Sequence, residues 1–401
     1  MKRTCAWPRP APSRFGRHWA LAPGVVFLNH GSFGACPKAI LDLQTELRRR
    51  LEAEPVQFLW RRYEERLEPA RATLARFVGA RPADLVFVTN ATTGVNAVVR
   101  SLTLRRGDEL LTTDHDYNAC HNALVETARR TGARLVVAAI PFPLRNADMA
   151  VEAVLRRVSA RTRLAMVDHV TSSTALVLPI ARLVRALQDR GVDVLVDGAH
   201  APGMMPLQLD SLGAAYYTGN LHKWVCAPKG TAFLWARPDK QAALQPAVIS
   251  HGNNTPRPGF TPFQDRFDWM GTFDPTAWFC AAAAITWLGR RLPGGWNQIY
   301  ARNRGLAVHA RRLLCARLSL EPPCPEEMLG AMATLPLPER FQDRPRTTKL
   351  DPEQLQLYDQ FGIEVPLLRI GQPERRYFRV SAQLYNSPAD YEFLARALDT
   401  L

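Results

Sequence analysis

Short apolar runs alternate along the chain with longer stretches whose apolar residues recur every three to four positions. The longer stretches predict amphipathic helices, for example over residues 118–131 and 178–190. The short runs predict strands over residues 85–88, 110–113, 134–138, 164–167, 192–196 and 232–235. This alternation of strands and helices predicts an α/β fold with a mostly parallel sheet that is covered by helices on both faces.

Polar side chains occur where several of these strands end. Asn90, Asp114, Asp168 and Asp197 each close or follow an apolar run. In open α/β sheets, ligands bind beyond the carboxyl ends of the strands. We therefore expect a ligand site at this edge of the sheet.

The last third of the chain has a different pattern, which predicts a second unit. Residues 251–275 are rich in Pro, Gly and Asn and predict a long loop, after which residues 277–288 predict a buried helix. Helices are then expected over 297–318, 351–361 and 388–398, strands over 362–368 and 377–382, and loops around Pro336 and Pro338. At 401 residues the chain exceeds one compact core. We expect a large domain over 25–285, a smaller α+β C-terminal domain over 286–401, and an N-terminal arm over 1–24 that packs with the small domain.

Composition and charge argue against several classes of protein. A content of 47% hydrophobic and 22% charged residues is ordinary for a soluble globular enzyme. The seven cysteines are never spaced as CxxC, which indicates reduced thiols in a cytoplasmic protein and no metal site. There is no secretory apolar segment and no run of 18 apolar residues, so we expect no membrane partner. The net charge of +14 comes from arginines mixed with glutamates on helical stretches, so we expect no nucleic-acid partner.

Asp197 and Lys223 carry the most specific chemistry in the sequence. Asp197 ends an apolar run, and Lys223 follows the mostly apolar segment that begins at Tyr216. A lysine amine forms a Schiff base with the aldehyde of pyridoxal phosphate, and a carboxylate holds the ring nitrogen of that cofactor protonated. Only six of the 51 basic residues are lysines, and arginine cannot form an imine. The alternative is a buried structural aspartate and an incidental surface lysine.

Other polar groups near these two residues are candidates for holding a phosphate or a flat ring. The turn TNATTG at 89–94 opens a predicted helix, where free N–H groups and threonine hydroxyls form an anion cradle; an ordinary N-cap has the same pattern. Further candidates for the phosphate are Asn220 and His222, and candidates for stacking on a ring are His115, Tyr117 and His200. A lone histidine among these is also compatible with a satisfied core residue.

Four motifs, taken together and in this order, carry a family resemblance. They are FLNHGSFG at 27–34, VDGAHAPG at 196–203, TGNLHKW at 218–224 and FRVSAQLYN at 378–386. The chain resembles the class V aminotransferase family of pyridoxal-phosphate enzymes, and within it the isopenicillin N epimerase branch, from about residue 29 to 386. The resemblance implies fold type I, with a mostly parallel seven-stranded sheet in the large domain and a smaller α+β C-terminal domain.

The resemblance also implies roles for individual residues. Lys223 would form the Schiff base, Asp197 would face the ring nitrogen, and Tyr117 would stack on the ring, with His115 as second choice. The phosphate would be held by Ala91, Thr92, Asn220 and His222, and Ser172 and His200 would lie near the ring oxygen. Ser172 stands where many members have asparagine, and His200 where desulfurases have glutamine. Gly271 and Thr272 would reach the phosphate of a neighbouring subunit, which implies a homodimer with shared active sites.

Several reactions are compatible with this family. The resemblance implies chemistry at the alpha carbon of an amino acid, with Arg379 binding its carboxylate and Asn29 close to its variable tail. Epimerisation through a quinonoid and beta-elimination by a carbon–sulfur lyase diverge after the alpha proton departs, and the sequence does not decide between them. Cysteine desulfurase chemistry needs a mobile cysteine shortly before the carboxylate-binding arginine, and residues 364–375 contain none. A cofactor-binding regulator without catalysis is the remaining alternative.

Overall fold

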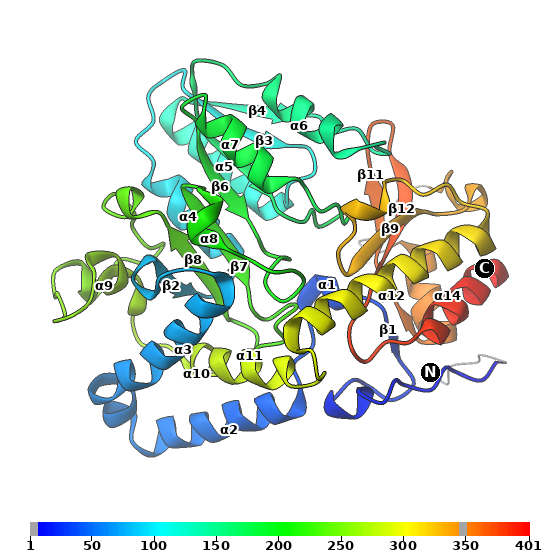
Figure 1. The fold of residues 1–401 in the computed structure, drawn as a ribbon, viewed down its shortest axis with the longest axis horizontal. Coiled ribbons are helices and arrows are strands. Elements are labelled where there is room, and N and C mark those ends of the chain that lie inside the picture. The colour runs from blue at the N-terminus through cyan, green and yellow to red at the C-terminus, as the bar shows by residue number, and fades with distance from the viewer. Residues whose placement is uncertain (1–6, 345–350) are drawn as a thin grey trace.

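The computed structural model describes residues 7–344 and 351–401, and its centre is a seven-stranded sheet (Figure 1). The strand order is β2-β8-β7-β6-β5-β3-β4. The strands are β2 (Leu85–Val88), β3 (Glu109–Thr113), β4 (Arg134–Ala138), β5 (Thr162–Asp168), β6 (Asp193–Asp197), β7 (Tyr216–Asn220) and β8 (Ala232–Ala236). The strand β8 runs antiparallel to both of its neighbours, β2 and β7, and all other neighbouring strands of this sheet are parallel. The predicted α/β fold with a mostly parallel seven-stranded sheet is therefore confirmed.

Helices cover both faces of this sheet, which explains why its strands are apolar without strict alternation. One face packs on α4 (Ala91–Ser101), α5 (Asn118–Thr131) and α9 (Pro262–Asp268). The other packs on α3 (Tyr63–Val78), α6 (Ala147–Leu155), α7 (Ile180–Gln188) and α11 (Ala281–Gly289). The carboxyl ends of β5, β6 and β7 lie together at one edge of the sheet, because these three strands are parallel neighbours.

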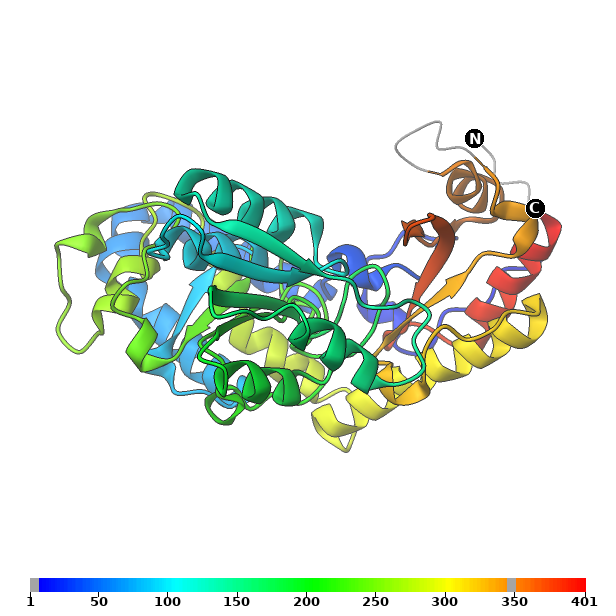
Figure 2. The ribbon, with the colours of Figure 1, turned by 90° about the horizontal axis from the view of Figure 1, so that it is seen from above.

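A second, smaller sheet lies beside the large one (Figure 2). It consists of the antiparallel strands β9 (Met332–Pro336), β11 (Leu367–Ile370) and β12 (Arg375–Ser381), with the order β11-β12-β9. The helices α12 (Gly295–Leu318) and α14 (Pro388–Thr400) pack on each other, and α12 also packs on β9. Separately, β1 (Val26–Phe27) pairs in parallel with β10 (Ile363–Glu364), so the N-terminal segment reaches the C-terminal part of the chain.

The region before residue 30 also touches the C-terminal part of the chain. The Ser13 hydroxyl donates to Leu384 O at 2.7 Å, and the Trp19 ring packs edge-on against Tyr385. Residues 1–6 of the predicted arm lie outside the described residues. These contacts agree with an arm that packs with the small domain, whereas the domain boundaries themselves stay a prediction.

Four elements differ from the sequence prediction. The strand predicted over 362–368 is two short strands in different sheets, β10 and β11. The segment 251–275, predicted as a loop, contains α9, which begins with a capping box between Thr261 and Gln264 and has Pro262 in its first turn. The helix predicted over 277–288 is divided at Cys280 into α10 (Thr276–Phe279) and α11. Pro336 ends the strand β9 where a loop was predicted. Proline is tolerated there because β9 is an edge strand.

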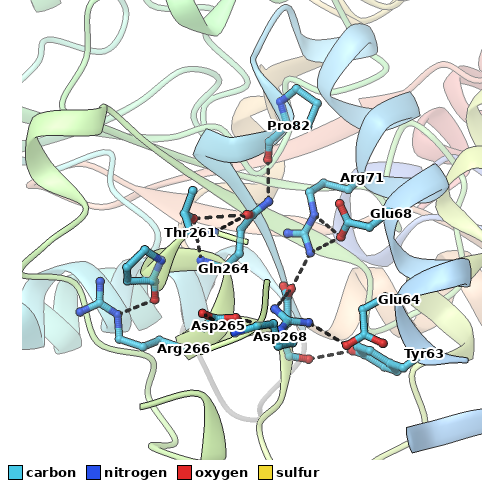
Figure 3. A network of polar contacts seen from close by, with 12 residues as sticks. Tyr63, Glu64, Glu68, Arg71, Pro82, Thr261, Gln264, Asp265, Arg266 and Asp268 are labelled. Carbon is cyan, nitrogen blue, oxygen red and sulfur yellow. Dashed lines mark hydrogen bonds and ion pairs between the residues drawn. The ribbon is translucent and has the colours of Figure 1, made fainter. Parts of the chain in front are cut away.

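A buried network of charges fixes α9 against α3 (Figure 3). The Asp268 carboxylate, 1% exposed, accepts from Arg71 Nη2 and from Arg257 Nη2, each at 2.7 Å. Arg257 also binds Asp265 at 2.8 Å and Glu64 at 3.0 Å. The Tyr63 hydroxyl donates to Asp268 O at 2.7 Å. The segment that leads to Gly271 and Thr272 is thereby anchored on α3.

Among the described residues, no helix combines the length and the apolar character needed to cross a membrane.

Candidate active site

A cavity of about 610 Å³ lies at the carboxyl ends of β5, β6 and β7 and at the start of α4. It brings together most of the predicted site residues, which come from five separate segments of the chain. These are Ala91, Thr92, Tyr117, Ser172, Asp197, His200, Asn220, His222 and Lys223. Asn29, Arg379, Gly271 and Thr272 are not among the residues that line it. A cavity therefore exists at the edge of the sheet where the ligand site is predicted, and its use by a ligand stays a prediction.

Lys223 is buried, and its environment favours the neutral amine. Its Nζ lies 3.0 Å from His200 Nε2, and the Trp224 indole N–H donates to His200 Nδ1 at 3.4 Å. Because an indole only donates, a neutral His200 carries its proton on Nε2 and donates it to the Lys223 amine. Burial, together with the cation of Arg379, lowers the pKa of Lys223 to about 7. Burial, followed by the charges of Lys223 and Arg379, holds the pKa of His200 well below its usual range.

The backbone of Lys223 is fixed by the N-terminal motif. His30 Nε2 lies 2.9 Å from Lys223 O, and His30 Nδ1 lies 2.8 Å from the Tyr385 hydroxyl. Burial lowers the pKa of His30 to about 3, so His30 is a neutral link between two distant segments. Gly34, with φ of +69°, comes so close to the His222 carbonyl that a Cβ would collide with it. This explains the glycine of the FLNHGSFG motif.

Asp197 is 3% exposed and held by two donors. Its Oδ1 accepts from Ala199 N–H at 2.9 Å, and its Oδ2 accepts from the Cys120 thiol at 3.2 Å. Burial raises the pKa of Asp197, and the Ala199 N–H opposes this shift by stabilising the carboxylate. Cys120 was not predicted as part of the site. Its contact arises from the packing of α5 over β6, for which the sequence has no local signal.

The start of α4 combines an N-cap with one free backbone donor, the Thr92 N–H. The Asn90 side chain accepts from Thr93 N–H at 2.8 Å, so this residue is an ordinary N-cap. Asn220 Oδ1 accepts from Ala91 N–H at 2.9 Å and ties β7 to the helix. The Thr92 N–H is in the first turn, where a helix has no partner for its own donors, and Thr92 lines the cavity. The cap and an anion cradle therefore coexist at this turn.

Arg379 lies next to the cavity in β12, and it is only 3% exposed. Its guanidinium donates to Ser172 O, to Ser32 Oγ at 3.0 Å and to Asn29 Oδ1 at 3.4 Å. Its Nε has no hydrogen-bond partner. Burial without a neutralising carboxylate lowers the pKa of Arg379 to about 10. Such an arginine can accept an anion from a ligand.

The two candidates for a stacking ring lie in different environments. Tyr117 lines the cavity and is 47% exposed. His115 is buried outside it, with Nδ1 2.9 Å from Thr174 Oγ1 and Nε2 3.1 Å from Ile140 O. His115 is therefore a satisfied core residue, and Tyr117 stays the candidate for stacking.

The family model for class V aminotransferases matches residues 35–335. The chain belongs to this family. Isopenicillin N epimerase from Streptomyces clavuligerus is 36% identical over 397 residues, which cover 95% of this chain and 96% of that protein. A putative L-cysteine desulfhydrase from Oryza sativa subsp. japonica is 31% identical over 416 residues, which cover 94% of this chain and 83% of that protein.

Solved structures of the same fold agree with this assignment. The cysteine desulfurase CsdA from Escherichia coli has a TM-score of 0.76 and 21% identity, and the match covers 96% of this chain and 97% of that chain. A variant of C-DES with glycine covalently linked to its pyridoxal-phosphate cofactor has a TM-score of 0.77 and 20% identity, with 96% and 98% covered. This class V protein is a pyridoxal-phosphate-dependent enzyme of fold type I.

The donor set of the cavity fits the cofactor. A buried amine with a lowered pKa, a buried carboxylate, the Thr92 N–H at a helix start and an aromatic ring all border one space. These are the groups that an aldehyde, a ring nitrogen, a phosphate and a flat ring need.

Proposed function

We propose that this enzyme acts at the alpha carbon of an amino acid or amino-acid conjugate, with epimerisation as its reaction. The observation that carries the proposal is the buried Lys223 amine, 3.0 Å from His200 and with a pKa of about 7. When bound, pyridoxal phosphate supplies an aldehyde for amines and a protonated ring that absorbs electrons. The chain supplies everything else: it binds the cofactor, moves a proton and orients the substrate.

Lys223 is proposed to hold the cofactor and then to move the alpha proton. A group with a pKa near 7 is suited to accept and return a proton at neutral pH. His200, through its Nε2, is placed to orient the amine. Asp197 is proposed to accept a hydrogen bond from the ring nitrogen, while Ala199 and Cys120 keep its carboxylate in place.

Arg379 is proposed to bind the substrate carboxylate. It is buried, and none of the described residues offers it a carboxylate within ion-pair distance, so a substrate anion would supply the missing charge. Ser32 and Ser172 contact Arg379 and also line the cavity, so the guanidinium lies directly behind two cavity-lining residues, which supports this role. The fork of an arginine binds a carboxylate with two parallel hydrogen bonds and so fixes the orientation of the alpha carbon. Asn29, bonded to Arg379, is proposed to lie close to the substrate tail.

A homodimer in the cytoplasm belongs to the same proposal. Several large apolar side chains are exposed, and two of them, Phe33 and Tyr117, line the cavity. The exposed side chains are Phe33, Val56, Trp60, Tyr117, Val248 and Ile249, each between 47% and 73% exposed. A partner subunit that covers them would bring its Gly271 and Thr272 to the phosphate. The six described cysteines are all free, which agrees with a reducing compartment.

A carbon–sulfur lyase is the second candidate, because L-cysteine desulfhydrases are also among the relatives at 30% identity or more. A cysteine desulfurase is less well supported. None of the cysteines in the described residues lines the cavity, and Cys324 is buried with its pKa raised to about 11, which is the opposite of a reactive thiolate.

The deciding experiment is incubation of the enzyme with a panel of amino acids and sulfur-containing conjugates in heavy water. Epimerisation predicts deuterium at the alpha carbon and formation of the opposite stereoisomer, without pyruvate or ammonia. Release of pyruvate and ammonia with a thiol would establish the lyase instead. A holoenzyme that exchanges no alpha proton in any amino acid would contradict both and favour a non-catalytic regulator.

A further inference from the structure

A second buried carboxyl group, that of Asp168, lies beside Asp197 and has no role in the proposed reaction. Asp168 ends β5 as Asp197 ends β6, and the two residues are paired in register. In-register residues of adjacent parallel strands point to the same face, and such strands are about 4.8 Å apart. Each residue is 3% exposed, and both line the cavity. Two carboxyl groups therefore lie side by side at the end of the cavity proposed to hold the ring nitrogen.

The two carboxyl groups differ in their partners. Asp197 accepts from Ala199 N–H and from the Cys120 thiol, and both donors stabilise an anion. Asp168 Oδ1 is buried and has no hydrogen-bond partner. An ionised carboxylate without donors is costly to bury, whereas a protonated acid is much less so. The proton of the pair therefore belongs on Asp168.

The negative charges around Asp168 also favour its protonated form. Asp197 on β6 and Asp116 in the turn before α5 are negative, the Cys120 thiol on α5 is uncharged, and Lys223 after β7 is the nearby base. Burial first, then Asp197 and Asp116, raise the pKa of Asp168 well above its usual range, and Lys223 opposes them less strongly. Two carboxyl groups in one buried site cannot both ionise without a large penalty.

We propose that Asp168 is a further positioning residue of the cofactor site, a carboxylic acid that keeps its proton beside ionised Asp197. The ring nitrogen then meets one negative charge instead of two, and the strength of its hydrogen bond to Asp197 is set by this balance. The inference rests on the proposed placement of the ring nitrogen at Asp197. Protonation of Asp168 itself does not depend on the cofactor.

Infrared spectroscopy of the folded protein at neutral pH tests the protonation directly. A protonated carboxyl group has a carbonyl stretching band, sensitive to heavy water, that a carboxylate lacks. We expect Asp168→Asn to remove one such band, in both the cofactor-free and the cofactor-bound protein. The matched control is Asp390→Asn, a carboxyl group buried outside this cavity, which should leave the Asp168 band in place. An unchanged spectrum in Asp168→Asn would overturn the proposal. If the Asp168→Asn protein does not fold, the same measurement is made on Asp168→Ser.

The pH dependence of stability gives a second readout that a merely structural role would not move. Because the folded-state pKa of Asp168 is raised, its stabilising contribution is full below about pH 4 and falls as pH rises through the folded-state pKa. Asparagine does not titrate. The free energy of unfolding of Asp168→Asn should therefore increase relative to wild type as pH rises. A constant difference for Asp168→Asn would contradict a proton on Asp168.

Cofactor binding separates this inference from the proposed function. Asparagine resembles a neutral acid in shape and charge, so Asp168→Asn should bind pyridoxal phosphate within about threefold of wild type at neutral pH. A tenfold or larger change would mean that Asp168 is ionised in the wild type, and it would overturn the inference. If wild type itself did not bind pyridoxal phosphate, the proposed function would fail and the positioning role with it. The infrared band would remain.

Discussion

At the scale of single residues, the site depends on charged groups held in states that water would not favour. Lys223 is buried beside His200, and burial together with the charge of Arg379 lowers its pKa to about 7, so its amine is neutral at a pH where an ordinary lysine is charged. Only the neutral amine reacts with an aldehyde. We therefore expect the rate at which cofactor-free protein takes up pyridoxal phosphate to rise with pH, with a midpoint near 7. Stopped-flow absorbance measures this rate. A midpoint near that of an ordinary lysine would contradict the assigned environment.

Arg379 gives a second prediction at this scale. Replacement by lysine removes the fork and leaves one point charge, so both binding and orientation of the substrate should suffer. We expect kcat/KM to fall roughly ten- to hundredfold, the value of a lost hydrogen bond to a charged group. Arg375→Lys is the matched control, because Arg375 lies exposed in the same strand and pairs with Glu339. Equal losses in both variants would exclude Arg379 as the carboxylate site.

The residues proposed to have chemical roles could be picked out from the sequence because their motifs are local, as in TGNLHKW around Lys223. Their supports could not. Cys120 on Asp197 and His30 on the Lys223 carbonyl are contacts between segments 77 and 193 residues apart, and no local pattern specifies them.

At the scale of elements, α9 and the charges around Asp268 hold the segment before Gly271. Arg257→Ala removes the bonds to Asp268, Asp265 and Glu64 and leaves Asp268 with Arg71 alone (Figure 3). We expect a loss of about 2 kcal/mol in the free energy of unfolding, measured with urea. Arg266→Ala is the control in the neighbouring helix α9, since Arg266 donates only to backbone carbonyls. A larger loss in the control would contradict the role of the network.

The strands and long helices were predictable from apolar periodicity, because burial on both faces produces continuous apolar runs. The helix α9 was missed, although Thr261, Pro262 and Gln264 form a recognisable capping box within a segment otherwise rich in loop residues. The division at Cys280 could not be predicted, because the residues on both sides are apolar helix formers and packing alone decides it.

At the scale of the whole molecule, the proposed shared active site predicts that a monomer is inactive and that two inactive variants restore activity when their subunits mix. A chain with Lys223→Ala lacks the amine, and a chain with Thr272→Glu repels the phosphate of its partner, so each homodimer should be inactive. An equal mixture that exchanges subunits should regain about one quarter of wild-type activity, because half the dimers are hybrids with one intact site. Sedimentation checks the dimer. Activity of a monomer, or no recovery on mixing, would contradict the shared site.

Lys223 is proposed to carry the cofactor, and borohydride reduction followed by peptide mapping identifies the lysine that does so. Reduction fixes pyridoxal phosphate covalently to the lysine that holds it. We expect one pyridoxyl group, on the peptide that contains Lys223, and none after Lys223→Ala. Lys229→Ala should keep the label, because Lys229 is exposed outside the cavity. A pyridoxyl group on Lys229 or on any other lysine of wild type would contradict the account.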